Sequence, residues 1–253
     1  MIPDIDAGFK ETCLNIFGRD IGDLEHYEKW LSSRVPLPIP AKSFLSGKEV
    51  WVPPPRMFIG TDFNKKRVID HCEVNRLSTS FRSEDLDNLN LTKIKKIIDP
   101  VLYYMGNLRF GNTWNMEKCS GAGPGSNVYY SEEAYQGVNN LAYCNCVLAS
   151  EYLYGCDNVP ESSFCIKSYN STKIKNCFEV DGCKNCVNSM FCHNCEDSTD
   201  CLFCFNVKGM QYCIGNTPLA KSDFFRIKNI LISYITTSLL EKKSLAIDIF
   251  NLK

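Results

Sequence analysis

The sequence of 253 residues contains little histidine and no excess of charge of either sign. Its three histidines, His26, His71 and His193, are too few for a histidine-rich metal site or a histidine-based pH switch. The 28 lysines and arginines nearly balance the 29 aspartates and glutamates, so the chain as a whole carries no field that would recruit nucleic acid or an anionic membrane. No arrangement of residues typical of a catalytic site is found, and we expect a protein that is not an enzyme.

Signals for secretion and for membrane insertion are also lacking. Residues 1–6 have neither the basic start nor the apolar run of a secretory signal. The most apolar stretch, residues 227–240, contains Lys228 and a Thr-Thr-Ser run, and it is shorter than the about 20 apolar residues that a bilayer span needs. We therefore expect an intracellular protein, soluble or bound in an assembly, with reduced thiols.

Cysteine, in contrast, is abundant, and its 15 residues form an odd number that excludes complete intramolecular disulfide pairing. Twelve of them fall between Cys144 and Cys213. Every third residue from Val138 to Cys213 is small or apolar, and eleven of those twelve cysteines occupy these positions, with Cys146 the exception. A period of three fits neither an α-helix nor a single flat strand, but it is typical of a β-solenoid that buries one small residue at regular intervals.

Asparagine marks the same repeat and helps to set the length of one coil. Asn or Asp often directly precedes every second of the inward positions, at Asn140, Asn158, Asn170, Asn176, Asn188, Asn194, Asp200 and Asn206. Asn accepts tight bends and can hydrogen-bond to its copy in the next coil. The residues that follow these inward positions are alternately apolar and mostly polar, which predicts two hexads, or twelve residues, per coil and roughly seven coils over residues 126–215. In so narrow a coil, Cys serves as a small hydrophobic residue.

The twelve-residue coil with inward Cys and Ser resembles the beetle-type antifreeze β-solenoid. The segment from Asn176 to Asn216 is also similar to uncharacterised Cys/Asn-rich hexad-repeat proteins of environmental bacteria and archaea. The resemblance covers about residues 126–225 and implies a fold without implying an activity. It does not extend to ice binding, which needs flat ranks of outward Thr that this chain lacks. By the same resemblance, cross-coil disulfides Cys177–Cys183, Cys186–Cys192 and Cys195–Cys201 are conceivable in an oxidising compartment.

Three C-x-x-C pairs offer an alternative role for the thiols. Zinc or an iron–sulfur cluster needs four convergent thiolates, and paired C-x-x-C motifs are the usual sign of one. Here, however, inward positions are three residues apart, so two adjacent cysteines produce the motif automatically. We expect no cofactor, and we keep a thiol-based zinc, iron–sulfur or redox module as the alternative, with Cys183, Cys186, Cys192, Cys195, Cys201 and Cys204 as its ligands.

An apolar ridge is predicted along one outer face of the solenoid. Monomers rarely leave so long a stripe exposed, so either the flanking regions or another protein chain must cover it. We expect a structural or protein-interaction component of a larger assembly that uses this ridge and extended N-terminal arms as binding surfaces. The ridge comprises Tyr130, Tyr154, Ile166, Phe178, Met190, Phe191, Leu202, Phe203 and Ile214.

The flanking regions complete a mainly β fold of three parts: a mixed α+β region over residues 1–125, the solenoid over 126–215 and a C-terminal helical cap and tail over 216–253. Residues 9–17 and 21–31 are predicted helices, the second capped by Asp20. Proline makes residues 35–40 and 51–55 extended, and residues 49–52 and 57–59 are candidate strands. A helix begins at residues 83–86 or at Thr92 and runs to Tyr104, with an interruption near Pro100. The glycine-rich residues 121–125 are interpreted as a hinge between domains, and residues 222–240 as the capping helix.

Overall fold

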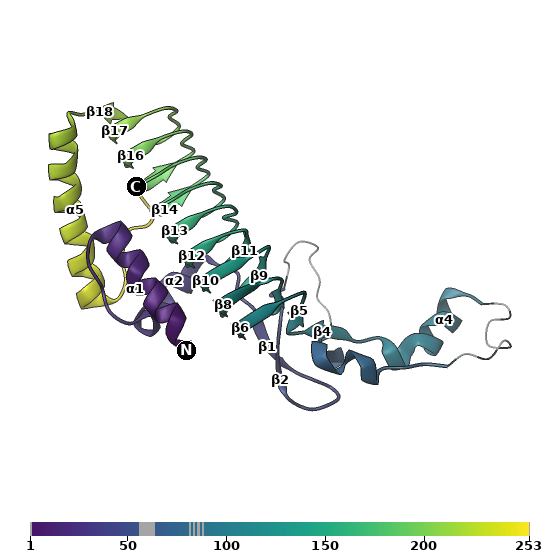
Figure 1. The fold of residues 1–253 in the computed structure, drawn as a ribbon. Coiled ribbons are helices and arrows are strands. Elements are labelled where there is room, and N and C mark those ends of the chain that lie inside the picture. The colour runs from purple at the N-terminus through teal and green to yellow at the C-terminus, as the bar shows by residue number, and fades with distance from the viewer. Residues whose placement is uncertain are drawn as a thin grey trace.

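The computed structural model describes residues 2–55, 64–80, 82, 84, 87 and 89–252. Its main body is a β-solenoid of stacked coils, with helices along one face and an arm that projects from the N-terminal end (Figure 1). The strand predicted over residues 57–59 lies outside the described residues, as does most of the helix start at residues 83–86. Within the part of the chain that is described, no helix is long and apolar enough to cross a membrane.

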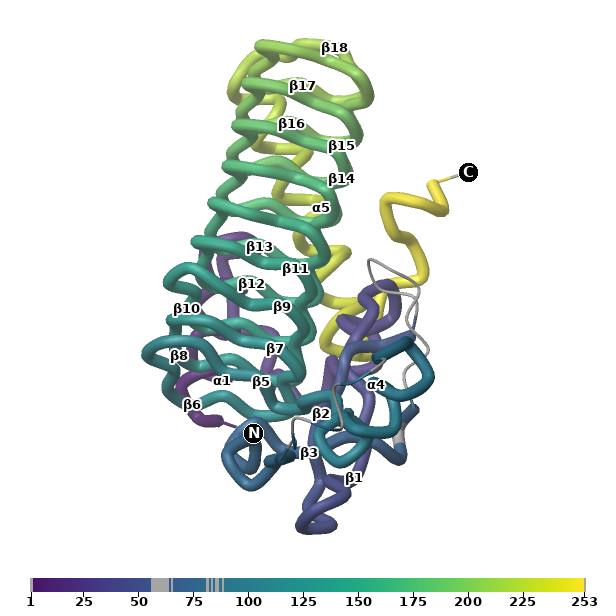
Figure 2. Tube along the Cα trace, turned by 90° about the vertical axis from the view of Figure 1, so that its right-hand side faces the viewer, coloured from purple at the N-terminus to yellow at the C-terminus, as the bar shows by residue number. Residues whose placement is uncertain are grey.

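The solenoid consists of parallel strands that pair with the strand one coil away (Figure 2). Glu151, for example, pairs with Ser163, and Leu153 pairs with Cys165, which confirms the twelve-residue repeat. The ten-stranded sheet contains, in chain order, β6 (Thr113–Glu117), β8 (Gly125–Tyr129), β10 (Val138–Ala142), β12 (Glu151–Tyr154), β13 (Ser163–Ile166), β14 (Phe178–Asp181), β15 (Met190–His193), β16 (Thr199–Leu202), β17 (Gln211–Ile214) and β18 (Thr217–Pro218). A second sheet contains β5 (Leu108–Arg109), β7 (Gly121–Ala122), β9 (Glu132–Tyr135) and β11 (Asn145–Leu148).

About nine turns are present instead of the predicted seven, because coils also form before residue 126. Val138 pairs with Gly125, thirteen residues earlier, whereas Thr113 and Gly125 are twelve apart. One extra residue, accommodated near Gln136 and Gly137, which both have positive φ, therefore shifts the phase of the three-residue pattern. Upstream of this shift the inward positions fall in a different phase, which conceals the first coils in the sequence.

The three-residue pattern has a backbone origin. From Asn140 onward, nearly every third residue has a φ near 50°, in the left-handed region, and each of these residues directly precedes an inward position. Asn and Asp tolerate this conformation better than most residues, which explains the predicted ladder. The stacked amides also bond as predicted: Asn176 Nδ2 donates to Asn188 Oδ1 at 3.1 Å, and Asn194 Nδ2 donates to Asn206 Oδ1 at 2.9 Å.

The glycine-rich residues 121–125 are part of the solenoid, so their interpretation as a hinge was wrong. They belong to β7 and β8 and pair within the two sheets. Glycine is required here because the next coil approaches closely. A Cβ atom on Gly125 would lie 2.5 Å from the carbonyl oxygen of Val138, and one on Gly123 would lie 2.6 Å from the ring of Tyr135.

Helices cover one face of the solenoid and its end is closed by a strand. The helix α5 (Lys221–Lys242) contains the predicted residues 222–240, but it runs alongside the coils instead of over their end (Figure 1). The short strand β18 pairs antiparallel with β17 and closes the stack. On the same face lies α1 (Pro3–Phe17), which starts earlier than the predicted residue 9 because Pro3 suits the first helical turn.

The segment after α1 is more irregular than predicted. Residues 21–31 do not form one helix: they divide into a 3₁₀ helix η1 (Leu24–Tyr27) and α2 (Glu28–Leu31), followed by η2 (Ser32–Arg34). The carboxylate of Asp20 accepts a hydrogen bond from the amide of Gly22, 2.7 Å away, and so closes a turn without capping a helix.

The arm has a small core of its own, made by Val50, Val52 and Val68. The candidate strand over residues 49–52 is confirmed as β2. The second predicted helix start is off by one residue, because Asn90 caps α4. The helix ends at Ile98, at the predicted interruption near Pro100, but it does not resume: one 3₁₀ turn follows, and Tyr104 begins a strand. The elements of the arm are β1 (Ile39–Lys42), β2 (Glu49–Val52), η3 (Lys65–Arg67), β3 (Val68–Asp70), η4 (His71–Arg76), α4 (Leu91–Ile98), η5 (Asp99–Val101) and β4 (Tyr104–Gly106).

Candidate interaction surfaces

The predicted ridge is covered by the chain itself. Tyr154, Ile166, Phe178 and Leu202 have no exposed surface, and Met190 and Phe191 are almost as deeply buried. Tyr130, Phe203 and Ile214 are partly buried against the same cluster. The other side of this cluster is supplied by α1, the segment after it and α5, through Phe9, Phe17, Trp30, Phe224, Ile235 and Leu239. The ridge is therefore covered by other segments of the same chain and not by another protein chain. Its residues do not form a free surface for a partner.

Aromatic contacts fit the N-terminal segment to the ridge. The ring of Phe178 lies 5.1 Å from that of Phe17 at an interplanar angle of 82°, and 6.2 Å from that of Trp30. The hydroxyl of Tyr154 donates to the carbonyl of Ile5 at 3.1 Å. A Cβ atom on Gly8 would lie 2.6 Å from this hydroxyl, so glycine allows α1 to lie against the coil.

A buried ion pair joins the solenoid to both ends of the chain. Lys167 and Glu179 are fully buried, with Nζ and Oε1 3.8 Å apart. The Lys167 ammonium also donates to the carbonyl of Trp30 at 3.2 Å, and the amide of Ile249 donates to Glu179 Oε2 at 3.1 Å. Burial raises the pKa of the Glu179 carboxyl to about 8. The sequence analysis missed this pair, whose only sequence signal is two charged residues twelve apart, each directly after a ridge residue.

Twelve of the cysteine side chains line the interior of the solenoid, and Cys13 is buried in the cluster beneath α1. Thirteen of the fifteen are buried, Cys146 is half-buried and Cys72 is exposed, and all fifteen are free. Buried thiols hydrogen-bond to carbonyls: Cys183 Sγ lies 3.5 Å from the oxygen of Asp181 and 3.6 Å from that of Cys192. Ser150 makes the same pair of bonds, to the carbonyls two residues before it and nine residues after it. Cys and Ser are thus alternative small donors for one position in the coil.

The interior of the solenoid shifts the acidity of its thiols in both directions. Burial raises the pKa of Cys144 and Cys165 well above that of a free thiol. Hydrogen bonds from neighbouring thiols have the opposite effect on Cys186, Cys195 and Cys204, whose pKa values are lowered. Among the described residues, no group of three or more His, Cys, Asp or Glu side chains is placed to hold a metal ion. The disulfides that the resemblance made conceivable are not formed. The two cysteines of each conceivable disulfide are six residues apart, which is half a coil. They therefore lie on opposite walls of the solenoid.

Among the described residues, most of the large exposed hydrophobic side chains lie on the arm and on the first coils of the solenoid. Others lie on α1, on α5 and on the tail, at Leu14, Ile230, Tyr234, Leu240, Ile247 and Phe250. The most exposed is Leu91, at 88%, followed by Trp114 on the edge strand β6, at 70%. In α4, Leu91, Ile94, Ile97 and Ile98 share one face, yet none of the residues of this helix is buried. The large exposed hydrophobic residues of this region are Phe44, Val74, Leu89, Leu91, Leu102, Tyr104, Met105, Phe110 and Trp114.

A compact set of contacts fixes the base of the arm to the solenoid. The amide of Asn107 donates to the carbonyl of Trp51 at 2.9 Å, and the Asn107 side chain accepts from the Trp51 amide at 2.9 Å. The Trp51 ring lies 5.3 Å from that of Tyr130, in the first part of the solenoid. Lys118 lies over the Tyr129, Tyr130 and Trp51 rings at 5.0, 5.6 and 5.9 Å. These contacts hold the arm in a defined direction (Figure 1).

The comparisons with known proteins add no assignment to these surfaces. The sequence of the chain matches no protein-family model and no curated protein.

Proposed function

We propose that this protein is a non-enzymatic interaction component in which the N-terminal arm binds a partner protein and the solenoid acts as its rigid support. The observation that carries the proposal is α4, an amphipathic helix with four apolar side chains on one face and no buried residue. Leu91 is 88% exposed, and Ile94, Ile97 and Ile98 are half-buried. An apolar stripe that stays partly open to solvent is typical of a binding site.

The chemistry of α4 also describes the partner. Its eight residues include Lys93, Lys95 and Lys96 and no acidic residue. Leu91, Ile94 and Ile98 follow the spacing i, i+3, i+7 that helices use when they bind in a groove. We therefore infer a partner with an apolar groove bordered by carboxylates. A helix of two turns buries too little apolar surface to hold the protein on a membrane by itself, which favours a protein partner.

The test is an affinity purification of the tagged full-length protein from cells of its native source. Leu91→Asp places a charge on the apolar face of α4 at a position that is 88% exposed, so the fold should be unaffected. The matched control is Leu240→Asp, the same substitution at an exposed position of α5. We expect wild type and control to retain the same partner, with the interaction weakened by salt, and Leu91→Asp to lose it.

Two results would contradict the proposal. One is equal recovery of the partner by wild type and Leu91→Asp, which would place the binding surface elsewhere. The other is binding of the wild type, but not of Leu91→Asp, to vesicles of anionic lipid with no protein retained. Circular dichroism of both variants shows whether their fold is intact.

A further inference from the structure

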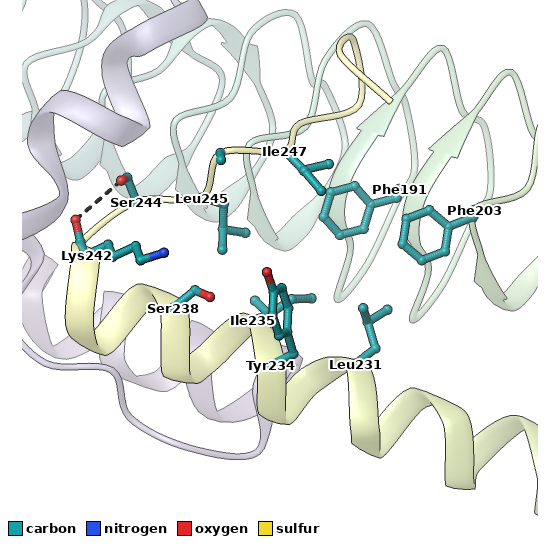
Figure 3. A pocket seen from close by; sticks show the side chains of 11 residues that line it. Phe191, Phe203, Leu231, Tyr234, Ile235, Ser238, Lys242, Ser244, Leu245 and Ile247 are labelled. Carbon is teal, nitrogen blue, oxygen red and sulfur yellow. Dashed lines mark hydrogen bonds between the residues drawn. The ribbon is translucent and has the colours of Figure 1, made fainter. Parts of the chain in front are cut away.

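A cavity of about 220 Å³ lies where α5, the solenoid and the C-terminal tail meet (Figure 3). Phe191 and Phe203 form its wall on the solenoid side, and Leu231 and Ile235 of α5 face them. The tail supplies the remaining apolar side through residues 245–247. This cavity is distinct from the arm and plays no part in the function proposed above.

Each wall of this cavity is held in place before any ligand arrives. Phe191 and Phe203 occupy the same position in successive coils and stack at 5.0 Å with an interplanar angle of 10°. The tail is fixed downstream of the cavity, where Asp248 pairs with Arg34 at 2.6 Å and the amide of Ile249 donates to the buried Glu179. Upstream of the cavity, α5 ends at its C-cap Lys243, whose backbone is left-handed, and the chain turns back there. The tail thus crosses the cavity as a strap held at both ends.

The polar groups of the cavity form one stripe on α5. Tyr234, Ser238 and Lys242 are spaced four residues apart, so they share a face of the helix and span about 12 Å. Among the described residues that line the cavity, only Lys242 is charged, and its ammonium points along the stripe toward Ser238 and Leu245 (Figure 3). Within the described part of the chain, the Tyr234 hydroxyl, the Ser238 hydroxyl and the Lys242 ammonium have no hydrogen-bond or ion-pair partner, and Tyr234 is 67% exposed at the open side.

We propose that this cavity binds a small amphipathic carboxylate, such as a medium-chain acyl acid or a short aryl acid. The apolar body of the ligand lies between the Phe191–Phe203 wall and Ile235, and its carboxylate accepts hydrogen bonds from the Lys242 ammonium and the Ser238 hydroxyl. A single cation at one end of an apolar cavity favours an anion over a neutral or cationic ligand of the same shape. The volume suits a ligand somewhat larger than benzene, which fills a cavity of about 150 Å³.

Isothermal titration calorimetry of the full chain with octanoate, octanol and octylamine tests the proposal. We expect octanoate to bind most tightly and octylamine most weakly. Lys242→Gln should weaken octanoate about tenfold or more and leave octanol unchanged, because it removes only the charged hydrogen bond. The matched control, Lys221→Gln, makes the same change at the other end of α5 and should bind octanoate as the wild type does.

A second variant locates the site independently of charge. Ser238→Phe fills the cavity between α5 and the solenoid and should abolish binding of both octanoate and octanol, with thermal unfolding used to confirm that the variant is folded. Octanoate binding no tighter than that of octanol, an unchanged affinity in Lys242→Gln, or binding that survives in a folded Ser238→Phe variant would each overturn the proposal. Absence of octanoate binding by the wild type at millimolar concentration would overturn it as well.

Discussion

The replacement of Phe178 by alanine tests whether the ridge is a core. The side chain has no exposed surface and lies among the rings of Phe17, Trp30 and Phe191, at centroid distances of 5.1, 6.2 and 5.3 Å. Truncation of a buried phenylalanine costs about 3–5 kcal/mol of the free energy of unfolding, through lost transfer free energy and the cavity that remains. Each lost aromatic pair adds about 0.5–1.5 kcal/mol to the effect of area alone, so the upper half of this range is expected.

Urea unfolding followed by circular dichroism measures this change, and calorimetry provides a second reading. For a chain of this length each kcal/mol shifts the melting temperature by about 2–4 °C, so a loss of about 4–5 kcal/mol should lower it by roughly 8–20 °C. Phe110→Ala serves as the control, because Phe110 is 51% exposed in the first part of the solenoid. Its replacement should change the free energy of unfolding by less than about 1 kcal/mol.

A double-mutant cycle that combines Phe178→Ala with Phe17→Ala tests specifically whether α1 packs on the ridge. Two side chains in contact should show a coupling free energy of about 0.5–3 kcal/mol, whereas independent sites add. The reasoning is refuted if Phe178→Ala unfolds with the wild-type free energy. It is also refuted if the effects of the two substitutions are additive, because α1 would then not cover this part of the ridge.

Three further predictions follow from the interior of the solenoid. A thiol reagent should modify Cys72 and Cys146 readily in the native protein and the other thirteen thiols only after unfolding; rapid reaction of more thiols would contradict the packing. In urea unfolding, Gly125→Ala should destabilise the protein by about 1–3 kcal/mol, because the new Cβ would lie 2.5 Å from a carbonyl oxygen of the next coil. The control Gly209→Asn, at an unobstructed position with φ of 66°, should be almost neutral. Burial raises the pKa of Glu132 to about 8, above its unfolded value near 4.5, so the folded state retains a proton at neutral pH and the stability contributed by this carboxyl decreases as the pH rises from about 4.5 to about 8. Glu132→Gln should remove up to about 1.4 kcal/mol per pH unit of this dependence. An unchanged pH profile of the free energy of unfolding would contradict this prediction.

The local rules of the coil were readable in the sequence because each of them repeats. A left-handed residue before each inward position favours Asn, and a narrow interior admits Cys, Ser and Val, so composition and backbone conformation coincide at intervals of three. The same reasoning failed upstream of Gly137, where a thirteen-residue coil shifts the pattern by one residue. A periodic signal depends on a constant phase, and the first coils interrupt it again, because Leu108 and Gly121 are also thirteen residues apart.

The buried ion pair and the cavity depend on contacts between distant segments, which the spacing of residues in the sequence does not predict. Lys167 and Glu179 are charged residues on a face of otherwise apolar character, and only their contacts with Trp30 and Ile249 explain why they are buried there. The cavity beside α5 forms only because the tail turns back across the helix. The sequence after Lys242 contains no signal that predicts this turn. In both places the partners are far apart in the chain, and local propensities say nothing about such pairs.

The sequence by itself determined the solenoid, its twelve-residue repeat and the role of its cysteines as packing residues, because one steric demand recurs in every coil. It also identified the apolar ridge. Only the tertiary structure decided that α1 and α5 cover this ridge and that the apolar face of α4 is only partly buried. The burial of an apolar surface depends on which distant segment lies against it, and that choice is made by packing of the whole chain.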